Sequence, residues 1–388
     1  MATDVHSAVK DVPLLDIHVD HENLENGVYQ VLTKLRSKWK REDIKRKYID
    51  ANSAHANRTF VCYITDDFDD AVVFRVHTDR FQQFVNREVS MKAFLLFNEI
   101  GLAPNVYCRL QNGICCEYVH GETFSKDHQE KLKDISIAKN VAKELAKVHA
   151  KRTTRIAAEN YNITEENAPW ITFDTLMKSW PTSYFDDECQ KLIDSHEFPT
   201  KEEFLKEKED MEKMISGLDL SFGFCHNDSG FGNVIYNEKK DRVVIVDYDV
   251  CGYNYQPLDL AQYTVSASLG YPKKYPEVGL RALFPPDQQR DICRVYLEAL
   301  RHLDVWDRDV TDGDVEKLYV QLVKLSFYFI IFGVAARGLM ASVPNVGPDT
   351  RPVDYMRSGI GNWNWYKEEK GRVLSMRVPD VNPRHNQN

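Results

Sequence analysis

Apolar and polar residues alternate in short runs over the first third of the chain, and this pattern predicts a small sheet. Residues 59–77 contain two such runs around the turn Asp-Asp-Phe-Asp-Asp, which is typical of a β-hairpin. The other elements predicted here are helices over 22–40 and 86–100 and strands over 106–110 and 114–119. We therefore expect a strand-rich N-terminal lobe over 21–120, preceded by a polar, disordered tail over 1–20.

Apolar residues recur at helical spacing through most of the chain after His120. The helices predicted from this spacing cover 129–151, 200–216, 256–269, 286–303, 313–342 and 352–370. We expect a larger, mainly helical C-terminal lobe over 121–372 and a tail over 373–388. The fold class is therefore predicted to be α+β with two lobes, and the ligand site is expected between them.

A polar segment interrupts the helical part and carries most of the candidate chemistry. His226, Asp228 and Asn233 form the pattern His-x-Asp-x4-Asn, and Asp247 follows at the end of an apolar strand. A phosphotransferase needs a carboxylate that accepts the proton of an attacking hydroxyl, and oxygen ligands for the magnesium ions that bridge the phosphates of ATP. The pattern predicts a kinase in which Asp228 is the base and Asn233 and Asp247 hold magnesium.

Residues around this segment are expected to complete the site. Asp249 is a candidate ligand for a second magnesium ion, or else an exposed carboxylate at the end of the strand. His226 is expected to hold the loop by hydrogen bonds, and Asp259 to pin it from the start of the next helix. In the N-terminal lobe, Arg75 on a strand and Glu88 at a helix start are expected to pair and to aim a positive charge at the ATP phosphates.

Composition narrows the class of protein. The net charge of −9 and the pI near 5.8 argue against nucleic acid as the main partner. The N-terminus lacks the apolar core of a signal peptide. The apolar run 325–336 is shorter than the roughly 20 residues that span a bilayer, so we expect a buried helix and no stable membrane insertion. Eight scattered cysteines without metal-binding spacing predict reduced thiols and a cytoplasmic location.

Several motifs together resemble those of the choline/ethanolamine kinases. They are Cys225-His226-Asn227-Asp228, Val246-Asp247-Tyr248-Asp249, Gly252-Tyr253-Asn254-Tyr255, Leu102-Ala103-Pro104 and Leu145-Ala146-Lys147-Val148-His149-Ala150. The similarity runs from about residue 40 to 370, and the motif at 252–255 is more specific than the kinase pattern. It implies a protein-kinase-like fold, ATP and Mg²⁺ as cofactors, a homodimer, and phosphorylation of the hydroxyl of choline or ethanolamine, the first step toward the corresponding phospholipid.

The resemblance also indicates where this chain departs from its family around the nucleotide. Glu117 lies in a matching motif and is expected at the ATP site. Family members usually carry a glycine-rich phosphate loop, whereas this chain has no glycine between Gly27 and Gly101. Residues other than glycine keep the backbone further from a ligand, so the expected helpers are the side chains of Asn57 and Ser53.

The substrate pocket is expected to be aromatic, because a quaternary ammonium is held by ring faces rather than by hydrogen bonds. The candidate rings are Tyr253, Phe329, Phe332, Trp363 and Trp365, although the spacing of 329 and 332 equally suits a buried helical stripe. Ser266 stands where the family carries an acidic residue near the amine. A primary ammonium depends more on that carboxylate, so choline is the favoured substrate.

Three alternatives stay open. In the first, the acceptor is ethanolamine. In the second, the chain is a weakly active family member that serves as a binding or dimer-forming partner, as the glycine-poor loop and Ser266 indicate. In the third, it is a kinase of the same fold that acts on an aminoglycoside-like or sugar hydroxyl, which leaves the motif at 252–255 unexplained.

Overall fold

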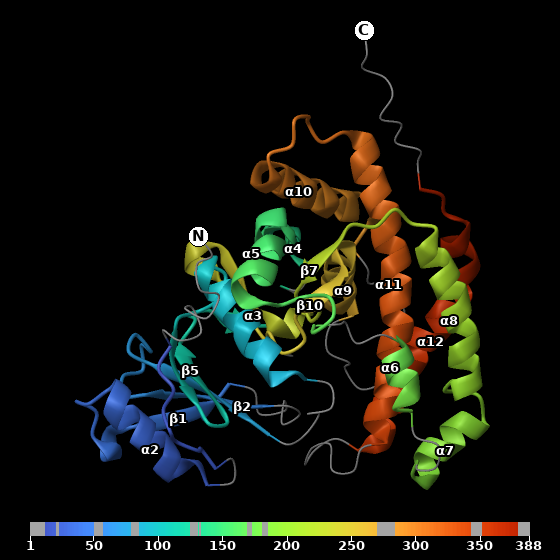
Figure 1. Cartoon of the computed structure of the whole chain (residues 1–388). Coiled ribbons are helices and arrows are strands. Elements are labelled where there is room, and N and C mark those ends of the chain that lie inside the picture. The colour runs from blue at the N-terminus through green and yellow to red at the C-terminus, as the bar shows by residue number, and fades with distance from the viewer. Residues whose placement is uncertain are drawn as a thin grey trace.

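The computed structural model has a small sheet-containing lobe and a larger helical lobe (Figure 1). The predicted two-lobed α+β class is confirmed. The residues that the structure describes are 12–20, 23–49, 57–78, 85–124, 131, 133–168, 173–180, 185–269, 284–342 and 351–378.

The N-terminal lobe contains a five-stranded antiparallel sheet with the strand order β1-β2-β3-β5-β4. Its elements are α2 (Leu24–Leu35), the 3₁₀ turn η1 (Arg41–Asp43), β1 (Lys45–Tyr48), β2 (Asn57–Tyr63), β3 (Val72–His77), α3 (Arg87–Glu99), β4 (Val106–Leu110) and β5 (Gly113–Glu117). The predicted hairpin is β2–β3. The strand β1 at the sheet edge was not predicted, because its sequence Lys-Arg-Lys-Tyr has no apolar alternation.

Both faces of this sheet are covered, because successive residues of a strand point to opposite sides. Phe60 and Phe74 lie opposite each other on β2 and β3 and pack in one cluster with α2. Their neighbours Val61 and Val73 pack in another cluster with α3. That second cluster also includes Phe224 of the C-terminal lobe, so α3 connects the sheet with the region that carries the catalytic segment.

The expectation of a disordered tail over 1–20 is wrong for its second half. Residues 12–20 run beside β4, where the backbone amide of Leu15 donates to the Arg109 carbonyl at 2.9 Å. Ile17 and Val19 are buried in the cluster formed with α2. Alternate apolar residues of this short segment therefore cover the lobe, which the low overall hydrophobicity of the first twenty residues obscured.

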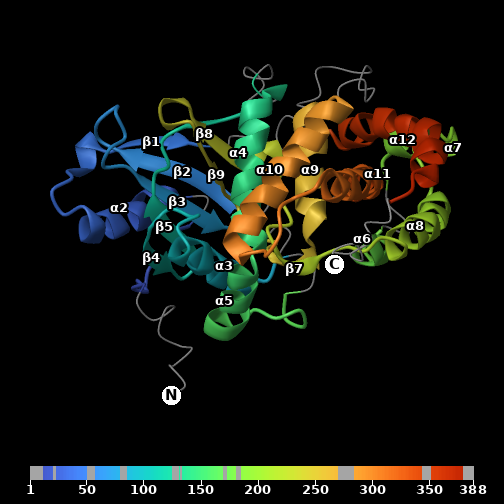
Figure 2. The ribbon, with the colours of Figure 1, turned by 90° about the horizontal axis from the view of Figure 1, so that it is seen from above.

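The C-terminal lobe is mainly helical, and Figure 2 shows its helices grouped on the side away from the sheet. Its helices are α4 (Ile135–His149), α5 (Lys151–Tyr161), α6 (Phe173–Lys178), α7 (Asp187–Asp194), α8 (Lys201–Ser216), α9 (Gln256–Leu269), α10 (Pro286–Asp304), α11 (Asp312–Ala341) and α12 (Pro352–Ser375). The helix α12 passes the expected end of the lobe at 372, because Val373 is buried against the helical core.

The long helix α11 is the centre of this lobe. At 30 residues it is long and apolar enough to cross a bilayer, so the length argument made from 325–336 does not hold. Its most apolar stretch is 72% buried inside the protein, where it packs against α12 and α9. Burial accounts for its apolar composition as a core helix.

Two small sheets of the C-terminal lobe hold the polar segment. They contain β6 (Glu122–Thr123), β7 (Phe222–Cys225), β8 (Val234–Asn237), β9 (Arg242–Ile245) and β10 (Gly252–Tyr255), with the 3₁₀ turns η4 (Phe231–Asn233) and η5 (Glu238–Lys240). β7 pairs with β10, and β8 pairs with β6 and β9, all antiparallel. The loop after β7 and the loop after β9 therefore open at neighbouring strand ends.

Candidate active site

The loop between β7 and β8 brings Asp228 and Asn233 into direct contact. The Asn233 amide nitrogen donates to the Asp228 carboxylate at 2.7 Å and to the Asp228 carbonyl at 2.8 Å. Gln262 of α9 approaches the second carboxylate oxygen at 3.4 Å. Because the Asn233 amide nitrogen points toward Asp228, the amide oxygen of Asn233 points away from that carboxylate.

Asp247 follows β9 and lies near Asp228 and Asn233. The amide of Val246 donates to the Asn233 carbonyl at 2.8 Å, which ties the two loops together one residue before Asp247. Asp247 has a φ of +73°, a conformation that is rare for a residue other than glycine and that gathers at functional sites. Its carboxylate is about one third exposed. The structure thus brings together the three residues that were expected to form the site.

The environment of Asp228 suits a general base. Burial raises the pKa of this carboxyl to about 7, and the negative charge of Asp247 adds to the rise, while the hydrogen bond from Asn233 opposes it. A base whose pKa lies near neutral pH combines a useful ionised fraction with a strong affinity for the proton that it accepts. The carboxylate is therefore equipped to accept a proton from a hydroxyl.

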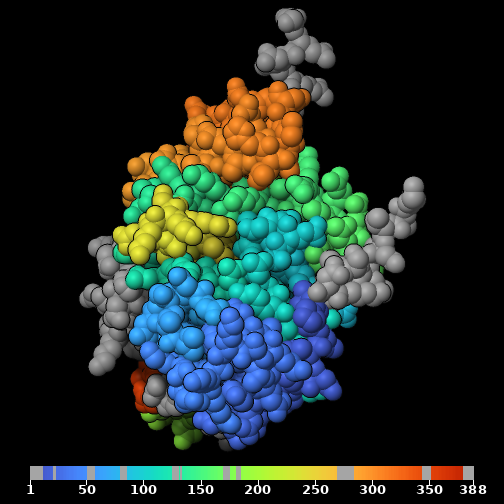
Figure 3. Space-filling view, turned by 90° about the vertical axis from the view of Figure 1, so that its left-hand side faces the viewer, coloured from blue at the N-terminus to red at the C-terminus, as the bar shows by residue number. Residues whose placement is uncertain are grey.

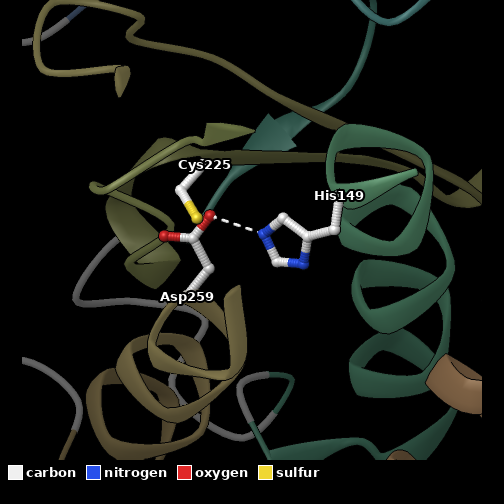
Figure 4. Close-up of side chains that lie close together, drawn as sticks. All are labelled: His149, Cys225 and Asp259. Atoms are coloured by element: carbon white, nitrogen blue, oxygen red, sulfur yellow. Dashed lines mark hydrogen bonds and ion pairs between the residues drawn. The ribbon is translucent and has the colours of Figure 1, made fainter. Parts of the chain in front are cut away.

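Asp259 at the start of α9 anchors the loop between β7 and β8. Its buried carboxylate accepts from the backbone amides of His226 at 2.7 Å and Asn227 at 2.8 Å. His149 Nε2 lies 3.0 Å from the same carboxylate, as Figure 4 shows. Three contacts to one buried charge fix the backbone that leads into Asp228, which is the role expected of Asp259.

His149, Cys225 and Asp259 lie close enough together to suggest a metal site. The hydrogen bonds and the protonation of these groups argue against a metal site. His149 Nδ1 lies 2.7 Å from the Tyr296 hydroxyl, and both Asp259 oxygens already accept hydrogen bonds. Burial raises the pKa of the Cys225 thiol well above its usual range, which opposes the thiolate that a metal needs. We interpret the trio as a support for the catalytic loop.

His226 is buried beside this support and contacts the backbone of Asp228. Its Nδ1 accepts from the Asp228 amide at 3.3 Å, and its ring packs near Phe97 and Tyr248. Burial lowers the pKa of the imidazole, so the ring is neutral at pH 7. These contacts fit the structural role expected of it.

Arg75 reaches the site from the N-terminal lobe, but its partner is not Glu88. Its guanidinium lies 2.5 Å from Asp247 and 2.9 Å from Asp249. Glu88 is 75% exposed and forms an ion pair with Lys92, one turn further along α3. The expected Arg75–Glu88 pair is therefore wrong, because Glu88 lies on the solvent side of that helix.

Asp249 does not have the surroundings of a metal ligand. It is buried, and its two oxygens accept from Asn57 at 2.7 Å, Ser90 at 2.6 Å and Arg87 at 3.1 Å, besides the ion pair with Arg75. Burial would raise the pKa of this carboxyl, but Arg75, the hydrogen bonds and Arg87 together hold it well below its usual range. We therefore correct the expectation for Asp249: it anchors the sheet and α3 to the strand end that carries Asp247.

The expected phosphate helpers are only partly described. Asn57, the first residue of β2, uses its amide nitrogen on Asp249 and accepts from Arg87 at 3.0 Å, so it is part of the same anchor. Residues 51–56, with Ser53, lie outside the described residues. Glu117, expected at the ATP site, ends β5 and accepts from the backbone and side chain of Asn105 at 3.2 and 2.7 Å. That contact fixes the strand end just before the chain enters the second lobe.

The five candidate pocket residues lie in different places. Phe329 and Phe332 are half-buried on α11, which packs against α9, the helix of Gln262 and Ser266. The Ser266 hydroxyl accepts from the Phe231 amide of the catalytic loop at 3.1 Å. The expected family carboxylate would therefore lie beside the loop of Asp228.

The other three rings make packing contacts. Trp363 is buried in the helical core, where it stacks on Tyr366 and contacts Phe204 of α8. Trp365 packs on Phe327 with ring centroids 4.5 Å apart. The hydroxyl of Tyr253 donates to the Thr154 carbonyl on α5 at 3.4 Å. The expectation that Trp363 lines a pocket is wrong, because α12 turns it toward α8.

The structure adds residues that sequence reasoning missed. Arg87 and Ser90 contact Asp249, and Gln262 contacts Asp228. Arg87 and Ser90 are three apart and share a helix face with the apolar residues of α3, so helical periodicity could have identified them in place of Glu88. Gln262 stands three residues after Asp259 on α9, and the same rule applies to it.

Comparisons with known proteins match one family over most of the chain. The family model for choline/ethanolamine kinase matches residues 49–335. The chain is 27% identical to ethanolamine kinase 1 of Mus musculus, with 95% of this chain and 97% of that protein aligned. It is 28% identical to ethanolamine kinase 2 of the same organism, with 95% and 87% aligned. A crystal structure of a choline kinase from Cryptosporidium parvum superimposes with a TM-score of 0.67 at 16% identity, covering 89% of this chain and 95% of that one.

Proposed function

Because the chain belongs to the choline/ethanolamine kinase family, we propose that it transfers the γ-phosphoryl group of ATP to the hydroxyl of ethanolamine. The observation that carries the kinase reaction is the convergence of Asp228, Asn233 and Asp247, next to a buried cation, at the boundary of two lobes. The fold of this family is protein-kinase-like, and the choline kinase structure from Cryptosporidium parvum has the same fold.

Two reasons favour ethanolamine as the acceptor over choline, which the sequence analysis favoured. Relatives that align with 95% of this chain include ethanolamine kinases 1 and 2 of Mus musculus. In addition, Trp363 is buried in the helical core and stacks on Tyr366, so this expected ring is not available to a quaternary ammonium. A pocket with fewer ring faces holds a quaternary ammonium more weakly, whereas a primary ammonium also donates hydrogen bonds to oxygen acceptors.

Asp228 is the proposed base. In its ionised form, the carboxylate accepts the hydroxyl proton of ethanolamine as the oxygen attacks the γ-phosphorus and the bond to ADP breaks. Asn233 and Gln262 orient the two carboxylate oxygens, and Asp259 holds the backbone of the loop. Positioning of this kind supplies much of the rate of phosphoryl transfer, because the protein forms no covalent bond with the group in transit.

The donor set fits magnesium. The amide oxygen of Asn233 accepts no hydrogen bond from the described residues, and the Asp247 carboxylate is partly exposed, so both can serve as hard oxygen ligands. A bound Mg²⁺ would neutralise charge on the phosphates. Arg75 and Arg87, held by Asp249, place two further positive charges on the side of the N-terminal lobe.

Purified protein with Mg·ATP, titrated in parallel with ethanolamine and choline while ADP release is followed, tests this proposal. We expect a higher kcat/KM for ethanolamine, by about tenfold or more, which corresponds to at least about 1.4 kcal/mol of discrimination. A higher value for choline would overturn the substrate assignment and retain the kinase. No ADP release with either amine, together with ATP binding, would favour the weakly active partner instead.

A further inference from the structure

The N-terminal lobe carries a strong local positive charge in an acidic protein. The fourteen residues 34–47 include eight Lys or Arg and two acidic residues, a net charge of +6. The whole chain has a net charge of −9, so the remaining residues carry −15. A separation of this size gives one face a potential opposite in sign to that of the rest of the molecule.

These charges lie together on the outer end of the lobe. The segment runs from the end of α2 through η1 into β1, the edge strand of the sheet, and all four residues of β1 are exposed. Figure 3 shows this side of the molecule, where the N-terminal lobe forms the lower part of the surface. We call the exposed Lys and Arg side chains of 34–47, with Tyr48 and Ile49 at the end of β1, the basic face.

Most cations of the basic face form no ion pair with the described residues, although Arg46 lies over the rings of Tyr48 and Phe60. Arg36, Arg41 and Lys45 pair with acidic side chains. Within the part of the chain that the structure describes, no ion pair involves the other five, which are Lys34, Lys38, Lys40, Arg46 and Lys47. Charges on an edge strand are a common protection against sheet-to-sheet association. That explanation covers only Arg46 and Lys47, because the other three precede the strand.

Apolar groups accompany the charges. Tyr48 and Ile49 are 43% and 39% exposed. A cavity of about 210 Å³ lies between α2 and the sheet, and it is lined by Arg41 and Arg46, by Glu25, and by apolar residues that include Leu32 and Ile44. Cations above apolar side chains suit a partner with anionic groups above an apolar layer. A second copy of this face would bring like charges together.

We propose that the basic face docks the protein on the surface of anionic phospholipid bilayers. The docking is peripheral: Lys and Arg contact lipid phosphates and carboxylates, while Tyr48 and Ile49 enter the headgroup layer. Each cation near such a surface strengthens binding by about fivefold, so five unpaired cations supply roughly three orders of magnitude in the partition coefficient. Binding of this origin weakens as salt shortens the Debye length from about 8 Å at 0.15 M to about 3 Å at 1 M.

Co-sedimentation of the full chain with sucrose-loaded vesicles tests the proposal. We expect binding to phosphatidylcholine vesicles that contain about 30% phosphatidylserine, little binding to phosphatidylcholine alone, and loss of binding in about 1 M salt. The variant K34Q/K38Q/K40Q/R46Q/K47Q should lower the partition coefficient at least a hundredfold. The matched control K143Q/K191Q/K206Q/K239Q/K240Q removes five exposed lysines of the other lobe and should bind like the parent protein.

Kinase activity in solution and the melting temperature show whether both variants fold, because none of these residues belongs to the site of Asp228. Equal vesicle binding by the basic-face variant and the parent would overturn the proposal, as would absence of binding to anionic vesicles. As a further test, the binding of a single-stranded RNA is measured by fluorescence anisotropy at the same salt concentration. RNA binding tighter than vesicle binding would assign the face to nucleic acid and reject the bilayer.

Discussion

Arg75 Nη2 and Asp247 Oδ1 lie 2.5 Å apart, although 172 residues separate them in the chain. Arg75 is on β3 of the N-terminal lobe, and Asp247 follows β9 of the C-terminal lobe. The guanidinium is largely buried, and its pKa is raised above the usual range by both nearby carboxylates against the effect of burial. One ion pair therefore couples the placement of the lobes to the orientation of a proposed magnesium ligand.

Arg75→Gln and Glu88→Gln should behave very differently. Loss of the Arg75 charge removes the partner of Asp247 and a cation proposed to face phosphate, so we expect kcat/KM for ATP to fall by about a hundredfold or more. Within the described part of the chain, Glu88 pairs with Lys92 at the surface, a contact that contributes below about 1 kcal/mol, so its variant should keep activity within about twofold. Steady-state kinetics with varied ATP measure both. A large loss in Glu88→Gln would restore the Arg75–Glu88 pair that the structure rejects.

Asp228→Asn should abolish turnover and leave nucleotide binding nearly intact. The amide keeps the shape and the contact with Asn233 but accepts no proton, so kcat should fall by at least about a thousandfold. Isothermal titration with Mg·ATP gives the affinity, and ADP release gives kcat. Asp307→Asn, at an exposed position, is the control and should match the parent protein. Turnover near the parent value in Asp228→Asn would exclude this residue as the base.

The same substitution should stabilise the protein at neutral and alkaline pH when no magnesium is present. The pKa of Asp228 is about 7 in the folded chain and about 3.9 in the unfolded one, so its stabilising protonated form is lost from the folded state as pH rises through 7. Asp228→Asn should be more stable than the parent by roughly 1 to 3 kcal/mol above pH 7, and the difference should vanish near pH 4. Urea unfolding across this range measures it. A constant difference at every pH would contradict the raised pKa.

Asp249→Asn should destabilise the fold strongly. The buried carboxylate contacts both Arg75 and Arg87, and its loss removes a buried negative charge that these two cations share, a change that costs about 3 kcal/mol or more. Asp66→Asn, which breaks an exposed pair with Lys45, is the matched control and should cost below about 1 kcal/mol. Unfolding by urea compares the two. If Asp249 were mainly a metal ligand, its variant would instead lose magnesium dependence with little change in stability.

Chelation should not affect the support behind the catalytic loop. Because His149, Cys225 and Asp259 satisfy one another and their neighbours without an ion, EDTA should leave the melting temperature of the nucleotide-free protein unchanged. Cys225→Ala should retain activity within a few-fold. Asp259→Asn should lower kcat by about a hundredfold through displacement of the loop, with a smaller effect on KM. Bound zinc in the purified protein, or a large loss of melting temperature with EDTA, would show a metal centre after all.

Local patterns were sufficient for most elements and for the chemistry of one segment. The β2–β3 hairpin and the helices α3, α8, α9, α10 and α11 are recognisable because periods of two and 3.6 residues are written in consecutive positions. The base and the two proposed magnesium ligands lie within twenty residues of one another. Short strands and turns give such a segment few ways to arrange its polar side chains, so their meeting could be inferred.

Contacts between distant elements required the tertiary structure. Which face of α3 meets the strand end decides that Ser90 and Arg87 contact Asp249 and that Glu88 does not. The direction of α12 decides that Trp363 packs against α8. The sequence of a helix shows that it has an apolar face. The partners of the polar side chains at the margin of that face depend on how the two lobes pack together. The sequence by itself therefore determined the kinase family and the segment proposed to carry the reaction, and only packing decided which residues anchor that segment.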